Sequence, residues 1–194
     1  MIYPHEAAKP VVAEYQPDWP GRAAGLVGVL STRLGPLATR IEHIGSTSIP
    51  GMAAKDIIDL QVSTADLDAA AAAFAAPLRD LGFEAGLFGH DHVPAGRPDS
   101  PELWVKRFWS RREHRDGDVN LHVRIAGSPN ERLALLFRDW FRAHPEAVPA
   151  YAAFKRSLAQ VTKDTLDYSD VKDPVVDVVI VVAEAWAAST RWQP

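Results

Sequence analysis

The sequence contains no cysteine among its 194 residues. Disulfide bonds, thiolate metal sites and cysteine nucleophiles are therefore excluded, and the composition is compatible with a reducing compartment. The chain also lacks an excess of charge of one sign, because 21 lysines and arginines face 25 aspartates and glutamates, for a formal net charge of -4. This balance gives no general attraction to nucleic acids or to anionic membranes.

Long hydrophobic runs are missing as well. The longest apolar segment, residues 175–188, is interrupted by Asp177 and Glu184 and is too short and too charged to be expected to cross a bilayer. Residues 1–10 carry charged side chains and lack the apolar stretch of a signal peptide. We therefore expect a cytoplasmic protein without a membrane partner.

Apolar residues make up 47% of the chain, which is enough for one sizeable core. We expect a single domain over residues 1–194. Its core would span about residues 11–127, and a helical C-terminal part would follow at about residues 128–190.

Hydrophobic periodicity and turn residues predict a mixture of helices and strands. The expected helices begin at about residues 18, 66, 128 and 149, and Ser63 or Thr64 is expected to cap the second. The expected strands are residues 11–15, a short piece through 41, 57–62, 83–88, 103–115 and 118–125. Residues 174–188 contain a valine run typical of a strand, but their length favours a helix.

The most informative stretch is residues 43–61. Gly45 and Ser46 form a turn in which the backbone can approach a ligand closely, because glycine has no Cβ. Asp59 follows inside an apolar, β-branched run that indicates a strand. A phosphate-binding turn before a strand-borne carboxylate suits a nucleotide with a divalent metal. The alternative is an ordinary tight turn and a structural acid paired with Lys55.

An Asp-Gly pair at residues 116–117 predicts a hairpin with a two-residue turn. In that register Arg111 lies opposite His122 and Trp109 lies opposite Arg124, all on the polar face. Arg111 would then clamp a phosphate or carboxylate, and Trp109 would stack on a base or ring. The alternatives are a solvated strand face and a hydrogen-bonded, half-buried histidine.

A His-Asp-His sequence at residues 90–92 has the composition of a metal pair. It lies in a segment rich in proline and glycine and has no third partner nearby in the sequence, so we expect an exposed loop.

An ordered set of motifs strongly resembles the GrpB family, a group placed in the nucleotidyltransferase-like superfamily. The motifs are Tyr15-x-Pro17-x-Trp19, residues 41–51 (IEHIGSTSIPG), Lys55, residues 57–59 (IID), residues 120–123 (NLHV), residues 137–142 (FRDWFR), His144-Pro145, Tyr151 and Lys155. They are spread over most of the chain.

The resemblance implies an α/β (α+β) fold of the nucleotidyltransferase-like type, with a short mixed β-sheet flanked by helices and a helical C-terminal part. It also implies a Gly-[Gly/Ser] turn followed about nine to thirteen residues later by Asp-x-[Asp/Glu]. Residues 47–58 separate Ser46 from Asp59, which fits this spacing. Two acids of the pattern are replaced, because Gln61 takes the place of the second and His122 that of the third.

These observations lead to a site hypothesis. Asp59 and His122 are the candidate catalytic residues and the candidate ligands of a divalent metal, Mg²⁺ or Mn²⁺. The candidate residues for binding substrate or phosphate are His43, Gly45, Ser46, Thr47, Lys55 and Arg111.

The resemblance implies transfer of a nucleotidyl group from a nucleoside triphosphate to an acceptor. The alternative is a non-catalytic module that binds a nucleotide or another anionic metabolite, since similar segments extend some bacterial dephospho-coenzyme A kinases. A hydrolase using His122 with a metal is a third possibility. In each case the expected partner is a nucleotide or another phosphorylated small molecule.

Overall fold

The computed structural model describes residues 8–194, so most of the segment in which a signal peptide was sought lies outside the described residues. Five strands, five α-helices and four short 3₁₀-helices make up the described chain. In chain order they are α1 (Trp19–Leu34), η1 (Gly35–Leu37), β1 (Arg40–Ile44), η2 (Ser46–Ser48), β2 (Ile57–Thr64), α2 (Leu67–Asp80), β3 (Glu84–Ala85), η3 (Pro101–Trp104), β4 (Lys106–Arg111), β5 (Asp118–Ile125), α3 (Pro129–Ala143), η4 (Pro145–Ala147), α4 (Val148–Val161) and α5 (Thr165–Thr190).

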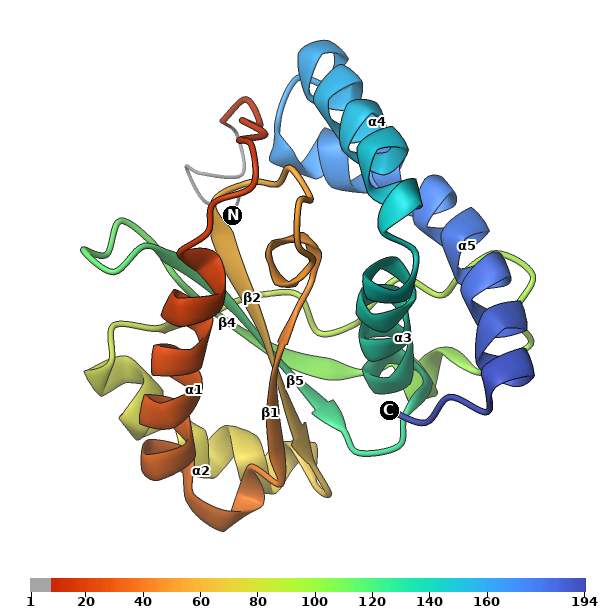
Figure 1. Cartoon of the computed structure of the whole chain (residues 1–194). Helices are drawn as coiled ribbons and strands as arrows, with labels where there is room; N and C mark the ends of the chain where they lie inside the picture. Colours follow the sequence, from red (N-terminus) through yellow and green to blue (C-terminus); the bar gives the residue numbers. More distant parts are fainter. Residues whose placement is uncertain (1–7) are drawn as a thin grey trace.

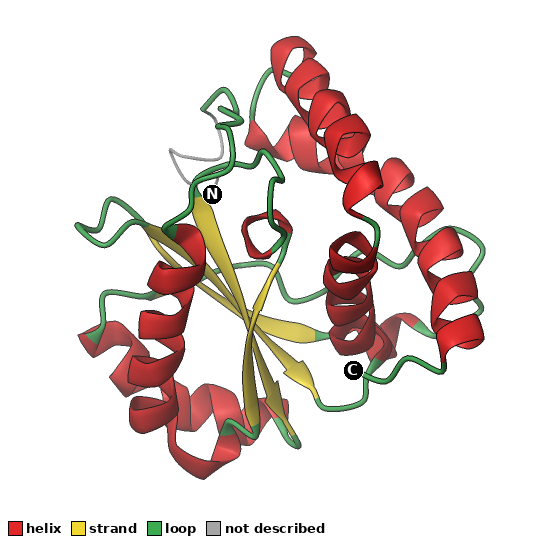
Figure 2. Cartoon of the chain, in the orientation of Figure 1, coloured by secondary structure: helices red, strands yellow, loops and turns green. Residues whose placement is uncertain are grey.

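The strands form one mixed sheet in the order β1-β2-β5-β4-β3. Only the central pair, β2 with β5, is parallel, and the other neighbours are antiparallel. Helices α1 and α2 lie on one side of this sheet and α3, α4 and α5 on the other (Figures 1 and 2). The predicted α/β class, with a short mixed sheet flanked by helices and a helical C-terminal part, is confirmed.

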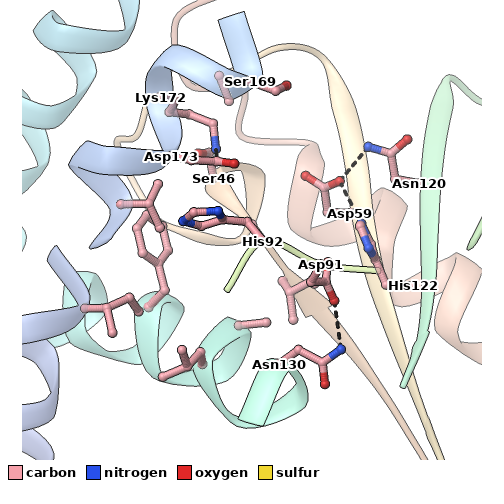
Figure 3. A pocket seen from close by; sticks show the side chains of 18 of the residues that line it. Ser46, Asp59, Asp91, His92, Asn120, His122, Asn130, Ser169, Lys172 and Asp173 are labelled. Atoms are coloured by element: carbon pink, nitrogen blue, oxygen red, sulfur yellow. Dashed lines mark hydrogen bonds and ion pairs between the residues drawn. The ribbon is translucent and has the colours of Figure 1, made fainter. Parts of the chain in front are cut away.

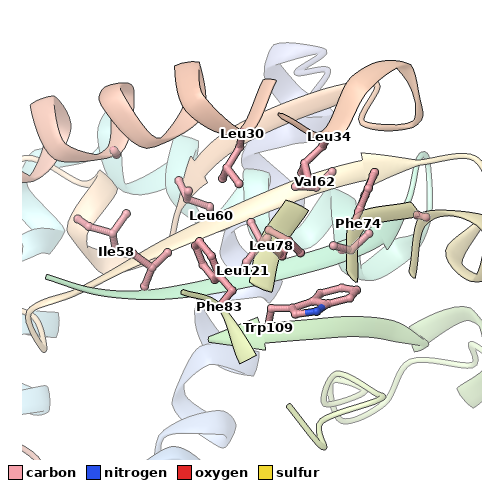
Figure 4. Packing of buried hydrophobic residues seen from close by; sticks show 14 of the residues in the cluster. Leu30, Leu34, Ile58, Leu60, Val62, Phe74, Leu78, Phe83, Trp109 and Leu121 are labelled. Atoms are coloured by element: carbon pink, nitrogen blue, oxygen red, sulfur yellow. The ribbon is translucent and has the colours of Figure 1, made fainter. Parts of the chain in front are cut away.

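The two faces of the sheet differ in chemistry because side chains alternate along each strand. On one face Leu60 and Val62 of β2 and Leu121 of β5 are fully buried against Leu30 of α1 and Phe74 of α2. Figure 4 shows these side chains interdigitating between the helices and the sheet. This apolar layer is the main core of the molecule.

The opposite face is polar at its centre and is covered by the C-terminal helices. A second apolar cluster contains Phe141 of α3, Val148 and Tyr151 of α4, and Met52, which follows η2. A third cluster joins α3 to α5 through Leu136 and other apolar side chains. These clusters hold the three helices on this side of the sheet and leave space above its polar residues.

Several predicted boundaries shift. Asp66, rather than Ser63 or Thr64, caps α2, and its carboxylate accepts the backbone N–H groups of Asp68 and Ala69 at 2.9 and 3.0 Å. This carboxylate satisfies two N–H donors that have no partner within the helix.

Three predicted strands are shorter and one predicted helix is longer than expected, and the strand predicted at residues 103–115 is reduced to β4. Residues 11–15 contribute only an isolated bridge between Ala13 and Ala54, and residues 83–88 contribute the two-residue β3. The last helix is confirmed, but it begins at Thr165 and continues through Pro174. Within the described residues, no helix has the length and apolar character needed to cross a membrane.

The predicted hairpin register is wrong. β4 ends at Arg111 and β5 begins at Asp118, so the connection is longer than two residues, and Arg111 pairs with Val119 instead of His122. A shift of three residues is odd, so it moves each β4 side chain to the other face of the sheet. Trp109 therefore pairs with Leu121 and is buried in the main core, where it cannot stack on a ligand.

Truncating the Phe74 ring tests the main core. Phe74→Ala removes a fully buried ring and should lower the free energy of unfolding by about 3–5 kcal/mol. Urea denaturation followed by tryptophan fluorescence measures this loss. Leu103→Ala, at a half-exposed side chain, is the control and should change stability by less than about 0.5 kcal/mol. Equal effects of the two substitutions would contradict the assigned core.

Candidate functional site

A cavity of about 400 Å³ lies between the polar face of the sheet and the C-terminal helices. Its polar wall includes side chains from η2, β2, β5, α4 and α5, and its apolar wall is formed mainly by α3 and α5. Figure 3 shows Asp59, Asn120 and His122 together on one side of this cavity, with Ser46, Lys172 and Asp173 on another.

The turn between β1 and η2 brings the backbone against Asp59. Gly45 has φ +68°, a conformation that favours glycine. A Cβ at this position would lie 2.5 Å from Asp59 Oδ2, closer than two such atoms can pack. The glycine is therefore needed twice, for its backbone conformation and for the close approach of the turn to the carboxylate.

The hydroxyl groups after Gly45 differ in availability. Ser46 Oγ accepts a hydrogen bond from Lys155 Nζ at 2.8 Å and lines the cavity. Thr47 is buried, and its hydroxyl contacts His43 Nε2 at 2.9 Å and donates to the Ile57 carbonyl at 3.4 Å. Ser46 can therefore face a ligand, whereas the hydroxyl of Thr47 is used within the fold.

Asp59 is held in place from β5. The register places it beside Asn120, whose Nδ2 donates to Asp59 Oδ1 at 2.7 Å. Arg112 donates to the carbonyl oxygen of the Asn120 side chain and so orients the amide toward Asp59. Burial acts to raise the pKa of the Asp59 carboxyl, but His122, Asn120 and the Lys55 ammonium together hold it below its usual range.

His122 is a neutral imidazole in this environment. Its Nδ1 faces two groups that can only donate, Lys106 Nζ at 3.3 Å and Arg124 Nη2 at 3.4 Å. The proton of the neutral ring therefore lies on Nε2, which is 3.8 Å from Asp59 Oδ1. Burial, reinforced by the charges of Lys106 and Arg124, lowers the pKa of His122 to about 4.

Two lysines line the cavity near the turn, the buried Lys155 from α4 and the half-buried Lys55 from the segment before β2. Burial lowers the pKa of Lys155 to about 7 and that of Lys55 to about 8, and the charge of Lys172 adds to both effects. The negative charge of Asp59 acts against both shifts. Lys55 Nζ makes a cation–π contact with the Tyr168 ring at 5.4 Å, and this ammonium has no hydrogen bond or ion pair with the side chains and backbone of residues 8–194. The ammonium groups therefore have little neutralising charge beyond that of Asp59.

Comparison with known proteins shows the family. The GrpB family model, described as GrpB protein, matches residues 9–181. The chain belongs to the GrpB family. A UPF0157 protein, BH1888 of Halalkalibacterium halodurans, is 32% identical over 95% of this chain and 87% of its own length. The crystal structure of conserved protein GrpB from Enterococcus faecalis superposes with a TM-score of 0.72 at 26% identity, covering 91% of this chain and 99% of that one.

Other similar proteins are longer. A protein named dephospho-CoA kinase from Mycolicibacterium paratuberculosis is 37% identical over 92% of this chain and 47% of its own length. This GrpB chain thus spans about half the length of such relatives. A structure of the Cid1 poly(U) polymerase matches with a TM-score of 0.47 at 12% identity, a likeness too distant to bear on function.

The structure brings together six of the eight predicted site residues of this GrpB chain. Gly45, Ser46, Thr47, Lys55, Asp59 and His122 all line the cavity. The other two do not line it. His43 lies behind the turn against Thr47, and Arg111 lies on the opposite face of the sheet, 5.2 Å from the Phe83 ring. The register shift in the hairpin accounts for Arg111.

The loop at residues 90–92 leaves His90 and His92 exposed, as expected, but the side chain of Asp91 turns inward. Its carboxylate forms ion pairs with Lys106 at 2.6 Å and Arg124 at 2.8 Å, and it accepts a hydrogen bond from Asn130 at 2.9 Å. The nearby arginine and lysine hold the pKa of Asp91 far below its usual range despite burial. Asp91 thus lies in the cavity wall with its charge balanced by the protein.

The cavity residues that were missed as site candidates include Asn120, Lys155 and Lys172. Asn120 was detectable, because it lies two residues before His122 and shares its strand face. Lys155 carries a weaker signal, since it follows Tyr151 by four residues on the buried face of α4. Lys172 has no sequence signal, because only the docking of α5 brings it to the cavity.

The residues of this cavity do not fit a divalent metal bound by the protein. No group of three or more histidine, aspartate and glutamate side chains within residues 8–194 could hold one. His122 offers no free lone pair, because Nδ1 accepts hydrogen bonds and Nε2 carries the proton. Asp59 supplies a carboxylate, but Lys55 and Lys155 act on it with positive charge.

Replacing the glycine of the turn tests its close contact with Asp59. Gly45→Ala should destabilise the protein by about 1–3 kcal/mol, because it adds backbone strain and displaces the carboxylate. Thermal and chemical unfolding measure the change. Gly28→Ala is the matched control, since its Cβ would meet no atom within 4 Å in α1, and it should stabilise the helix by about 0.5–1 kcal/mol. A neutral Gly45→Ala would refute the role given to this glycine.

Proposed function

We propose that this GrpB domain is a binding module for a phosphorylated small molecule of the nucleotide class. Its phosphate would lie beside Ser46 and interact with Lys55 and Lys155. The observation that supports this most directly is the presence of a buried lysine, Lys155, and a half-buried one, Lys55, opposed by a single nearby carboxylate. Ammonium groups in such a position gain stability when an anion binds.

The geometry around Ser46 supports a phosphate in particular. Lys155 is almost fully buried, and its hydrogen-bond acceptor is a neutral hydroxyl. The Lys55 ammonium lies over the Tyr168 ring and has no hydrogen-bond or ion-pair partner among the described residues. A phosphate provides several charged acceptors at once, so one group can satisfy both lysines. The cavity of about 400 Å³ also has room for the rest of a small molecule.

Binding accounts for the site better than nucleotidyl transfer does. Transfer with divalent metals needs carboxylates that are free to bind them. Asp91 is a second acid in the cavity wall, but Lys106, Arg124 and Asn130 already engage it. We therefore derive no chemical step through a metal. The name of the dephospho-CoA kinase relatives makes dephospho-coenzyme A one compound to include among the ligands tested.

The first experiment measures phosphate binding without a metal. Ribose 5-phosphate should bind to the protein in EDTA, as followed by isothermal titration calorimetry at pH 6.5. Lys155→Met should weaken this binding about tenfold to a hundredfold, since it removes a charge-assisted hydrogen bond worth about 1.5–3 kcal/mol. Lys163→Met, at an exposed lysine away from the cavity, is the control and should bind like the wild type.

Asp59→Asn separates the two hypotheses for the carboxylate. Asparagine keeps an oxygen for the Asn120 amide, so the fold should persist. Binding in EDTA should also persist. Binding that needs Mg²⁺ and disappears in Asp59→Asn would instead support a metal site. Labelled nucleoside triphosphates with Mg²⁺ or Mn²⁺ and a metabolite pool should give no transferred label, and transfer would contradict a purely binding role.

The pH dependence gives a further prediction. Lys155 and Lys55 bind an anion in their charged forms, and their pKa values in the free protein are about 7 and about 8. Affinity for ribose 5-phosphate should therefore be highest near pH 6.5–7 and fall as the pH rises from 7 to 9, because both lysines lose their charge there while the ionisation of the phosphate (pKa about 6) is nearly complete.

Calorimetry in buffers of different ionisation enthalpy should show net proton uptake on binding at pH 8, because the bound anion raises the pKa of both lysines. Lys155→Met should take up fewer protons than the wild type. Affinity that stays constant from pH 6.5 to 9, without proton uptake, would show that these lysines do not contact the phosphate.

A further inference from the structure

A second cavity, of about 250 Å³, lies beside the first. Its walls come from the segment around β3, from β4 and β5, and from the first turns of α5. It shares four residues with the first cavity: Lys55, Ile57, Asn120 and Ser169. A ligand that contacts Lys55 can therefore reach both cavities.

One wall of the second cavity is aromatic. Phe88 and Phe108 meet edge to face, with ring centroids 5.7 Å apart, and Phe108 meets His122 of the first cavity at 5.1 Å. Gly86 lies directly against the Phe108 ring, because a Cβ there would come within 2.4 Å of Cδ1. The Phe88 side chain remains 43% exposed, so an apolar ring faces this opening rather than the core.

The rest of the wall is polar and offers both donors and acceptors. Arg112 donates to the Val119 carbonyl at 2.8 Å and to the side chain of Asn120. Asp118 is partly exposed, and one of its oxygens accepts the Glu113 backbone N–H at 2.9 Å. Ser110 adds a hydroxyl group to the same wall. A flat ring with polar edges suits such a combination of aromatic and hydrogen-bonding groups.

We propose that the second cavity holds the nucleobase of a nucleotide whose phosphate lies at Lys55 and Lys155 in the first. This inference rests on the proposed function and specifies its ligand further. Lys55 stands at the junction of the cavities, where the phosphate of a nucleotide would lie if its ring occupied the aromatic wall. The two cavities then form one extended site for a nucleoside phosphate.

Calorimetry with three kinds of probe tests this inference. Ribose 5-phosphate supplies the phosphate without a base, adenosine supplies a base without the phosphate, and AMP, CMP, GMP and UMP supply both. At least one of the four nucleotides should bind about tenfold more tightly than ribose 5-phosphate, because the base adds stacking on an aromatic side chain.

Phe88→Ala should reduce that advantage about fivefold to tenfold and leave the affinity for ribose 5-phosphate unchanged. Phe88→Tyr keeps the ring and should retain the advantage. Leu87→Ala is the matched control, because Leu87 is 70% exposed and lines neither cavity, and it should behave like the wild type. Unfolding temperatures measured on each variant verify that the fold is intact.

The outcomes distinguish the two proposals. If ribose 5-phosphate binds but no nucleotide binds more tightly, the base site is refuted and the phosphate site stands. The base site is also refuted if Phe88→Ala weakens ribose 5-phosphate and nucleotide equally. If nucleotides bind and depend on Phe88 while Lys155→Met has no effect, the phosphate position is refuted and the base site stands. If none of the probes binds, both proposals are overturned.

Discussion

The parallel pairing of β2 with β5 is the constraint on which the rest of the structure depends. Its register sets Asp59 beside Asn120 and Gln61 beside His122, with Leu60 and Leu121 on the other face. Because side chains alternate, the same pairing produces an apolar layer for α1 and α2 and a polar layer beneath the C-terminal helices. The core and the candidate site thus lie on opposite faces of the same pair of strands, and a change in the register of this pair would disrupt both.

In the polar layer, the positive side chains around Asp91 are paired directly with a carboxylate, whereas those at the turn are not. Asp91 is closely paired with Lys106 and Arg124, and Asn130 adds a hydrogen bond, so each of these two cations has a carboxylate in direct contact. At the turn, Lys55 and Lys155 share only the partial compensation of Asp59. Buried charges are costly unless they are paired. An anionic ligand therefore gains the most binding free energy at the turn, where Lys55 and Lys155 lack a directly contacting carboxylate. This difference within one cavity underlies the proposed phosphate position.

Hydrogen bonds link the turn to the second cavity. Arg112 orients Asn120, and Asn120 in turn holds Asp59, against which Gly45 packs. Asn120 lines the second cavity and donates a hydrogen bond to Asp59 in the first. A ring that contacted Asn120 would therefore be linked to the Asp59 carboxylate through this one hydrogen bond. Such a chain fixes the position of Asp59 without a metal, because its oxygen is already bound by an amide and faced by the neutral His122.

The sequence by itself determined the turn at Gly45 and Ser46 and the strand that carries Asp59, because these depend on local periodicity, glycine and chain spacing. The α/β class followed from the resemblance of its motifs to the GrpB family. The tertiary structure decided which distant side chains join the turn and this strand. Lys155 and Lys172 reach the cavity only through the docking of α4 and α5.

The hairpin shows why such contacts cannot be predicted from local sequence patterns alone. The connection between β4 and β5 is longer than the Asp-Gly pair suggests, and the resulting register turns Arg111 away from the cavity. Strand register depends on the whole loop and on which side chains the core buries. The residues near the turn were therefore predictable from sequence, whereas the opposing charges that define the site follow from long-range packing.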